Sequence, residues 1–206
     1  MVVVDNDTLL STTRSVRLKL DLDRPVEPEV INECLSLALQ APSPGNLQMW
    51  RWIVVTDPQV RAELGQLFRE VGNEYLASLP PTVPEHSLRS GRFLIDNIER
   101  VPVLVVPCVL GRPPATLFES AVFWGGIYPA TWSFQLALRS RGLGSTLTTY
   151  HLSREAEAAR ILGIPEDVTQ TCLLPVAYTT QQDFKPAQRM PLGEVAYADH
   201  WGNALT

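Results

Sequence analysis

Cysteine is scarce in this sequence, and its spacing argues against a disulfide framework. The 206 residues include three cysteines, Cys34, Cys108 and Cys172, which are odd in number, far apart and set among apolar neighbours. A small disulfide-stapled fold needs an even and closely spaced set, whereas free cysteine often packs as a small apolar side chain. We therefore expect three buried free thiols.

Long apolar runs and an excess of positive charge are also missing. No uncharged apolar stretch approaches the ~20 residues that a membrane helix requires, and residues 1–5 lack the basic region and apolar core of a secretory signal. The formal net charge is −5 and the pI is about 5.2, so few cations are available to displace counterions from a nucleic acid backbone. We expect a cytoplasmic protein that binds neither membranes nor nucleic acid.

A self-sufficient set of catalytic residues is absent as well. His86, His151 and His200 have no spacing that suggests a metal site, and no serine or cysteine lies in a nucleophile motif. The glycines of residues 142–144 follow a predicted helix and precede a predicted strand, which is the reverse of the order in a dinucleotide-binding turn. We expect no bound metal, and an organic cofactor would explain the shortage because it carries the chemistry itself.

The residues that are present predict a globular protein of alternating helices and strands. The composition is 45% hydrophobic and 19% charged, and the length suits one domain spanning residues 1–206. Apolar periodicity, prolines and glycines predict the boundaries of the elements. The expected helices cover residues 8–16, 28–41, 59–77, 88–100, 118–139 and 154–162, and the expected strands cover residues 52–55, 101–109, 145–149 and 172–179.

Two short segments carry groups suited to a ligand. Arg14-Ser15-Val16-Arg17 places two guanidinium groups and a hydroxyl within four residues at a helix end or loop, and the planar fork of arginine suits bidentate recognition of a phosphate. Alone, such a pair is more often solvated surface. The second segment, residues 41–50, reads APSPGNLQMW and joins the second predicted helix to a strand.

In this order, these segments resemble the nitroreductase family. The Ser-Val-Arg start, the Ala-Pro-Ser loop with its Asn and Gln, and the Ile-Val-Val strand keep the family's spacing. Residues 128–130, 143–149 and 189–195 are similar to its interface helix, to the loop behind its flavin and to its carboxyl-terminal basic segment. The resemblance spans roughly residues 8–203, and four weak to moderate motifs in the correct order make a specific combination.

The resemblance implies an α+β fold with three layers, α-β-α, in which helices flank a central mixed, mostly antiparallel sheet. It also implies an intertwined homodimer with FMN bound between the subunits. The implied activity is the transfer of a hydride from NADPH or NADH through the flavin to a small electron-poor acceptor such as a nitroaromatic, a quinone or an activated alkene.

The resemblance assigns the flavin contacts by position. The phosphate would be held by Arg14, Arg17 and Arg189 with the Ser15 hydroxyl, and Lys185 is a weaker candidate. The second subunit would contribute Pro42, Ser43 and Asn46. Leu147, Thr148, Thr149 and Tyr150 would lie behind the ring, with a backbone amide near Thr149 directed at the nitrogen N5 that receives hydride.

Three departures from the family pattern leave alternatives open. Pro44 replaces a frequent serine, Met49 replaces a frequent proline, and residues 93–96 lack the Asn and Lys that touch the pyrimidine edge of the ring in better-known bacterial members. One alternative is a protein that stores FMN or uses it for deiodination, desaturation or cofactor fragmentation. Another is a dimeric interaction module that has lost its flavin site.

Overall fold

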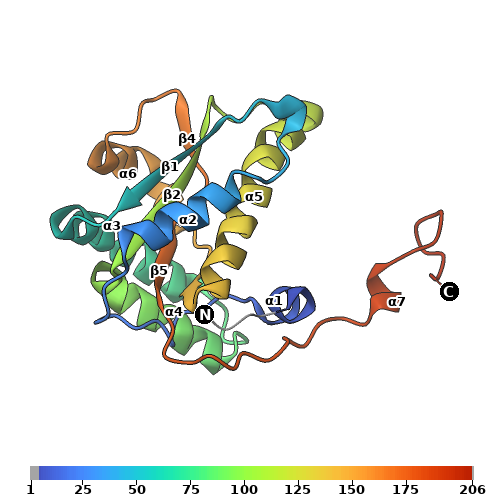
Figure 1. The fold of residues 1–206 in the computed structure, drawn as a ribbon, viewed down its shortest axis with the longest axis horizontal. Helices are drawn as coiled ribbons and strands as arrows, with labels where there is room; N and C mark the ends of the chain where they lie inside the picture. Colours follow the sequence, from blue (N-terminus) through green and yellow to red (C-terminus); the bar gives the residue numbers. More distant parts are fainter. Residues whose placement is uncertain (1–4, 206) are drawn as a thin grey trace.

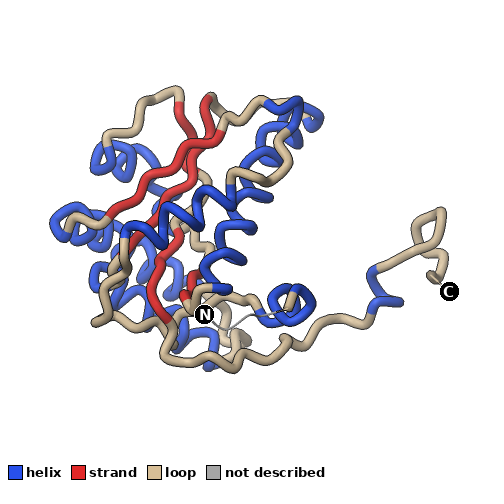
Figure 2. Tube along the Cα trace, in the orientation of Figure 1, coloured by secondary structure: helices blue, strands red, loops and turns tan. Residues whose placement is uncertain are grey.

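The computed structural model describes residues 5–205 as a central sheet with helices on both faces (Figures 1 and 2). The interpretation of residues 1–5 as lacking a secretory signal rests mostly on residues 1–4, which lie outside the described part. The architecture confirms the predicted α+β fold.

Five strands form the sheet. They are β1 (Trp50–Val55), β2 (Val103–Leu110), β3 (Leu143–Ser145), β4 (Val168–Gln170) and β5 (Leu174–Tyr178). The order is β1-β2-β5-β3, and β4 also pairs with β2. Every strand pair is antiparallel, and an isolated bridge between Gly111 and Val168 is parallel. Pro107 inside β2 offers no donor, but its carbonyl accepts hydrogen bonds from the Thr171 amide (3.0 Å) and hydroxyl (2.8 Å).

The described residues form seven helices, of which α7 lies on the extended C-terminal segment, away from the sheet (Figure 1). They are α1 (Asn6–Thr12), α2 (Pro28–Ala38), α3 (Pro58–Ser78), α4 (Glu85–Asn97), α5 (Leu117–Ser140), α6 (Glu155–Leu162) and α7 (Leu192–Val195). Single 3₁₀ segments lie at Pro44–Asn46, Ile98–Arg100 and Tyr150–Arg154. The start of α3 shows how the sequence sets a boundary: Asp57 accepts hydrogen bonds from the amides of Gln59 and Val60, and Pro58 occupies the first turn.

Strand β2 separates the two helical layers, because its side chains alternate between two cores. Leu104 and Val106 pack in the core that contains Leu64 and Phe68 of α3 and the buried residues of α4. Val103 on the other face packs with α2 and α5. A strand buried on both faces has helices on each side, so the predicted three-layer arrangement is confirmed.

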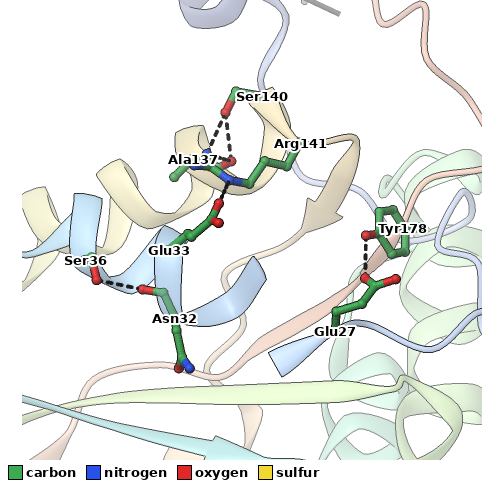
Figure 3. Close-up of polar contacts among 8 residues, drawn as sticks. All are labelled: Glu27, Asn32, Glu33, Ser36, Ala137, Ser140, Arg141 and Tyr178. Atoms are coloured by element: carbon green, nitrogen blue, oxygen red, sulfur yellow. Dashed lines mark hydrogen bonds and ion pairs between the residues drawn. The ribbon is translucent and has the colours of Figure 1, made fainter. Parts of the chain in front are cut away.

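Helix α5 is the long apolar helix that the sequence predicts. Its middle is buried, whereas Leu117 and Phe118 at its start are 86% and 78% exposed. At its end, Arg141 forms a 3.2 Å ion pair with Glu33 of α2, and Figure 3 shows this contact beside the hydrogen bond from the Tyr178 hydroxyl to Glu27. These contacts tie α2 to α5 and to β5.

Two sequence predictions are wrong in their boundaries. The first helix ends at Thr12 instead of residue 16, because the Thr12 and Thr13 hydroxyls bond to carbonyls of the preceding turn (both 2.6 Å) and Thr13 adopts extended dihedrals. The strand predicted over residues 145–149 is β3, which ends at Ser145, and Thr148 keeps only a single bridge to Leu173. Strand β4 and helix α7 were not predicted.

The end of the chain extends away from the rest of the fold (Figure 1). We call residues 185–205 the C-terminal arm. Met190, Leu192, Val195 and Trp201 on the arm are 54–90% exposed. None of these side chains belongs to a hydrophobic core in the described residues, so the arm has no core of its own.

Gly144 is the position where added volume should disturb this arrangement most directly. A Cβ at Gly144 would lie 2.7 Å from Thr179 Cγ2 and 3.0 Å from Val16 Cβ, whereas a Cβ at Gly193 would meet nothing within 4 Å. Gly144→Ala should lower the free energy of unfolding by about 1–3 kcal/mol. The Gly193→Ala control should stay within about 0.5 kcal/mol of the parent. Urea unfolding measures both, and equal stabilities would contradict the close packing described.

Candidate functional site

A large cavity of about 680 Å³ lies where segments from the two ends of the chain meet. Its walls come from the segment after α1, the end of α3, the start of α4, the middle of α5 and the C-terminal arm. The lining residues are Thr13, Arg14, Ser15, Arg17, Tyr75, Leu76, Leu79, Val83, His86, Ser87, Leu88, Ser90, Gly91, Trp132, Tyr150, Ala187 and Arg189. The structure therefore brings Arg14, Ser15, Arg17 and Arg189 to one cavity, as the motifs predict, and no carboxylate lines it.

The backbone on either side of Val16 holds Ser15 and Arg17 beside the cavity. Val16 is buried, and its amide donates a 2.9 Å hydrogen bond to the Ser145 carbonyl at the edge of β3. The chain bends at Arg17, whose carbonyl accepts a 3.2 Å hydrogen bond from the Leu20 amide. Ser15, which is exposed, and Arg17, which is half-buried, both line the cavity.

The three arginines differ in what holds them. Arg14 donates to the Lys185 carbonyl at 3.2 Å, and Arg189 donates to the carbonyl of its neighbour Gln188 at 3.2 Å. Arg17 is half-buried, and its guanidinium has no hydrogen bond or ion pair with any residue in the range 5–205. Burial lowers the pKa of Arg17, an effect that nearby Tyr150 opposes. A partly desolvated cation without a partner is unfavourable, so Arg17 is suited to an anion or an acceptor atom in the cavity.

Lys185, the weaker phosphate candidate, contributes differently. Its carbonyl accepts the hydrogen bond from Arg14, whereas its side chain does not line the cavity. Sequence position alone could not show whether Lys185 or Arg189 lines the cavity, because both residues belong to one basic segment near the end of the chain.

The loop after β3 borders a second, smaller cavity of about 140 Å³ beside the first. Leu147, Thr148, Thr149 and Tyr150 line it together with Arg17. The Thr148 amide is used in a 3.0 Å hydrogen bond to the Leu173 carbonyl. The exposed Thr149 has an amide without an acceptor in the described chain, so it is available to a ligand. Arg17 is shared by both cavities, whereas Arg14 and Arg189 line only the larger one.

Tyr150 forms the border between the cavity and the core. Its ring centroid is 5.1 Å from those of Phe68 and Tyr75 in tilted contacts. Such aromatic contacts hold ring orientations. These contacts hold the wall between the smaller cavity and α3 in place.

The loop with Pro42, Ser43 and Asn46 lies away from the arginines. The Ser43 hydroxyl and the Asn46 side-chain oxygen accept hydrogen bonds from the Gln48 amide (2.9 Å) and side chain (3.0 Å), and Asn46 has φ 54°. The loop packs on α5, where Pro44 borders an apolar crevice of about 30 Å³. None of the three predicted residues lines a cavity that contains Arg14, Arg17 or Arg189.

Sequence reasoning missed the wall formed by α3, α4 and α5. Tyr75, His86, Ser87, Ser90 and Trp132 lie in this wall. The available signal is indirect: three prolines within residues 79–84 are typical of a surface loop, and such loops often border a site. Leu79 and Val83 of that loop do line the cavity.

The cysteines are unsuited to nucleophilic catalysis. All three cysteines are buried and free, as predicted, and burial raises the pKa of Cys108 and of Cys172 to about 12, so neither forms a thiolate readily. Within residues 5–205, no group of three His, Cys, Asp or Glu side chains is arranged to hold a metal ion. The same part of the chain contains no helix long and apolar enough to span a membrane.

The fold and the cavity define an α+β protein with a carboxylate-free cleft lined by cations from both ends of its chain. The pattern of the Nitroreductase family matches residues 10–178. The chain belongs to the nitroreductase family, as its motifs predict, and the match ends before the basic segment at residues 189–195.

Known proteins share the fold over nearly the full length. A protein of Thermus thermophilus named NADH dehydrogenase is 28% identical over 208 residues, which cover 94% of this chain and 95% of that protein. A crystal structure of an FMN and NADPH-dependent nitroreductase from a Sphigopyxis strain has a TM-score of 0.72 at 19% identity, covering 96% of this chain and 100% of that one. An iodotyrosine deiodinase crystallised with FMN and 3-iodo-L-tyrosine has a TM-score of 0.70 at 21% identity, covering 93% and 97%.

His151, next to the cavity-lining Tyr150, should make stability depend on pH. It is fully buried, neither ring nitrogen has a partner in the described residues, and burial lowers its pKa to about 4, an effect that Glu155 opposes. The pKa of His151 in the folded protein lies below its ordinary value of 6.5, so the unfolded chain takes up a proton at a higher pH than the folded one. Above pH 6.5 the ring is neutral in both states, and stability falls as the pH drops from 6.5 towards 4. The loss should reach about 2 kcal/mol by pH 5.

His151→Asn, which does not titrate, isolates this contribution. Urea unfolding at pH 7, 6 and 5 should show a steeper loss of stability for the parent than for the variant. Parallel pH profiles would contradict the assignment.

Proposed function

We propose that the chain is a single FMN-binding domain that works as an NAD(P)H-dependent oxidoreductase. It would pass a hydride from NADPH or NADH through the flavin to an electron-poor acceptor such as a nitroaromatic or a quinone. The observation that carries this proposal is the meeting of Arg14, Arg17 and Arg189 in one carboxylate-free cavity. Membership of the family and the names of its relatives support the oxidoreductase class.

The residues present fit a flavin phosphate. Arg14, Arg189 and the Ser15 hydroxyl offer charge-assisted donors to a phosphomonoester that carries about −1.5 to −2 charge. The volume of about 680 Å³ lies in the range of small-molecule sites. Arg17 is unpaired and shared with the smaller cavity, so we assign it to the junction of the phosphate side and the ring side instead of to the phosphate alone.

When bound, the flavin would supply hydride acceptance and donation, and the chain would supply orientation and polarity. The Thr149 amide is a donor that the protein leaves free beside the smaller cavity. A preformed donor costs no reorganisation when charge develops on a ligand atom. Tyr75, Leu79, Val83 and Trp132 provide an apolar and aromatic wall against which flat molecules can stack.

A homodimer is part of this proposal. Leu47, Leu117 and Phe118 are 61–86% exposed at the start of α5 and the loop packed on it. Exposed apolar side chains on elements that pack together are suited to an interface with a second copy. Pro42, Ser43 and Asn46 sit in this region, away from their own chain's arginines, so a second copy would place them against the neighbouring flavin.

A second candidate function is supported by the similarity to the deiodinase, whose fold this chain shares. In this alternative, the protein binds FMN for storage or for a specialised reaction such as deiodination or desaturation and oxidises NAD(P)H poorly. A dimeric module without flavin is the third possibility. The three differ in two properties: possession of flavin and its reduction by nicotinamide.

The visible spectrum of the purified protein, recorded anaerobically before and after NADPH or NADH is added, separates them. We expect flavin absorption bands, either as purified or after FMN is added, that bleach with the nicotinamide and return when a nitroaromatic or a quinone follows. Bands that persist through both nicotinamides would favour storage or a specialised flavin reaction. A protein that remains colourless after incubation with FMN would contradict flavin binding.

A further inference from the structure

Arg139 is a buried cation that the proposed site does not use. It lies in the last turn of α5 and is 9% exposed. It forms no ion pair with any carboxylate in residues 5–205, and its Nε has no hydrogen-bond partner there. Burial lowers the pKa of Arg139, an effect that the charge of Asp183 opposes. An apolar side chain would avoid this desolvation, so the contacts of the guanidinium need an explanation.

Those contacts converge on the chain leading to the C-terminal arm. The Arg139 Nη2 donates a 2.9 Å hydrogen bond to the Gln182 carbonyl, and its guanidinium carbon lies 5.0 Å from the centre of the Phe184 ring. This distance is within the range of a cation–π contact. One buried side chain therefore fixes both the backbone and a side chain of residues 182–184.

The attachment matters because of its place in the chain. Before it, Thr179 and Thr180 are held by backbone hydrogen bonds to Gly142 and Lys19. Phe184 also packs against the core that contains α3 and α4. Between Phe184 and Arg189, the hydrogen bond that joins the segment to the rest of the described chain runs from Arg14 to the Lys185 carbonyl. Arg189 follows Phe184 by five positions, a length of chain that can span about 17 Å when extended. Without Arg139, residues 182–184 would lose a hydrogen bond and a cation–π contact, so the segment that leads to Arg189 would be held less firmly.

We propose that Arg139 is a positioning residue: it holds residues 182–184 against the end of α5 and so directs Arg189 into the large cavity. The inference rests on the proposed function, because Arg189 is taken to bind the flavin phosphate. Arg139 itself does not line the cavity and acts through Arg189.

A double-mutant cycle tests this coupling. FMN dissociation constants would be measured by flavin fluorescence for the parent, Arg139→Met, Arg189→Ala and the double variant. Arg139→Met should weaken binding about tenfold in the parent but less than twofold in the Arg189→Ala background, because the group that it positions is then absent. The matched control, Arg141→Met, removes a neighbouring arginine that contacts Glu33 on α2 (Figure 3) and should change affinity less than twofold.

An equal loss in both backgrounds, or no loss in either, would overturn the proposal, even if Arg139→Met lowers the melting temperature. An unchanged affinity in Arg189→Ala would overturn it as well. Chymotrypsin cleavage after Phe184 gives a readout that needs no flavin. Arg139→Met should speed this cleavage several-fold and Arg141→Met should not, and equal rates would also overturn the proposal. If the parent binds no FMN, the proposed function fails, while cleavage still decides whether Arg139 holds the segment.

Discussion

The site depends on residues 13–21, a segment that bends at Arg17 and is hydrogen-bonded to β3 and to the end of β5. The Val16 amide bonds to the Ser145 carbonyl, the Asp21 amide bonds to the Tyr178 carbonyl, and the Thr180 amide bonds back to the Lys19 carbonyl. Backbone groups that would otherwise be buried without partners are satisfied in this way. As a result, the beginning of the chain and the segment leading to its end lie side by side, and their arginines face one cavity.

This arrangement concentrates positive charge where the rest of the protein is acidic. The chain carries a formal net charge of −5, yet three arginines and no carboxylate line the large cavity. Like charges in a partly desolvated space repel one another, and an anion bound there relieves the repulsion. A ligand that binds only the folded chain stabilises it by mass action. The same groups that recognise a phosphate would therefore make the fold more stable when the ligand is present.

The sequence allowed prediction of the groups that lie close together along the chain. Arg14, Ser15 and Arg17 were found from their spacing, and the apolar α5 from its composition. The cavity wall formed by α3 and α4 could not be predicted in this way. Tyr75 and His86 come to line the same cavity as Arg14 only because α3 and α4 pack on the sheet. The β-branched residues after Ser145 suggested a longer strand, but after β3 only Thr148 keeps a bridge. Strand β4 is three residues long and contains Thr169 and Gln170, so it gave no clear pattern.

The central claim is that the cavity recognises a phosphate, and comparing two flavins tests it most directly. Riboflavin has the ring system of FMN without the phosphate, so the ratio of the two dissociation constants isolates that group. Charge-assisted hydrogen bonds are each worth about 1.5–3 kcal/mol, so loss of the phosphate contacts should weaken binding roughly 100-fold or more. Similar affinities for riboflavin and FMN would contradict the account, because the arginines would then contribute nothing to recognition.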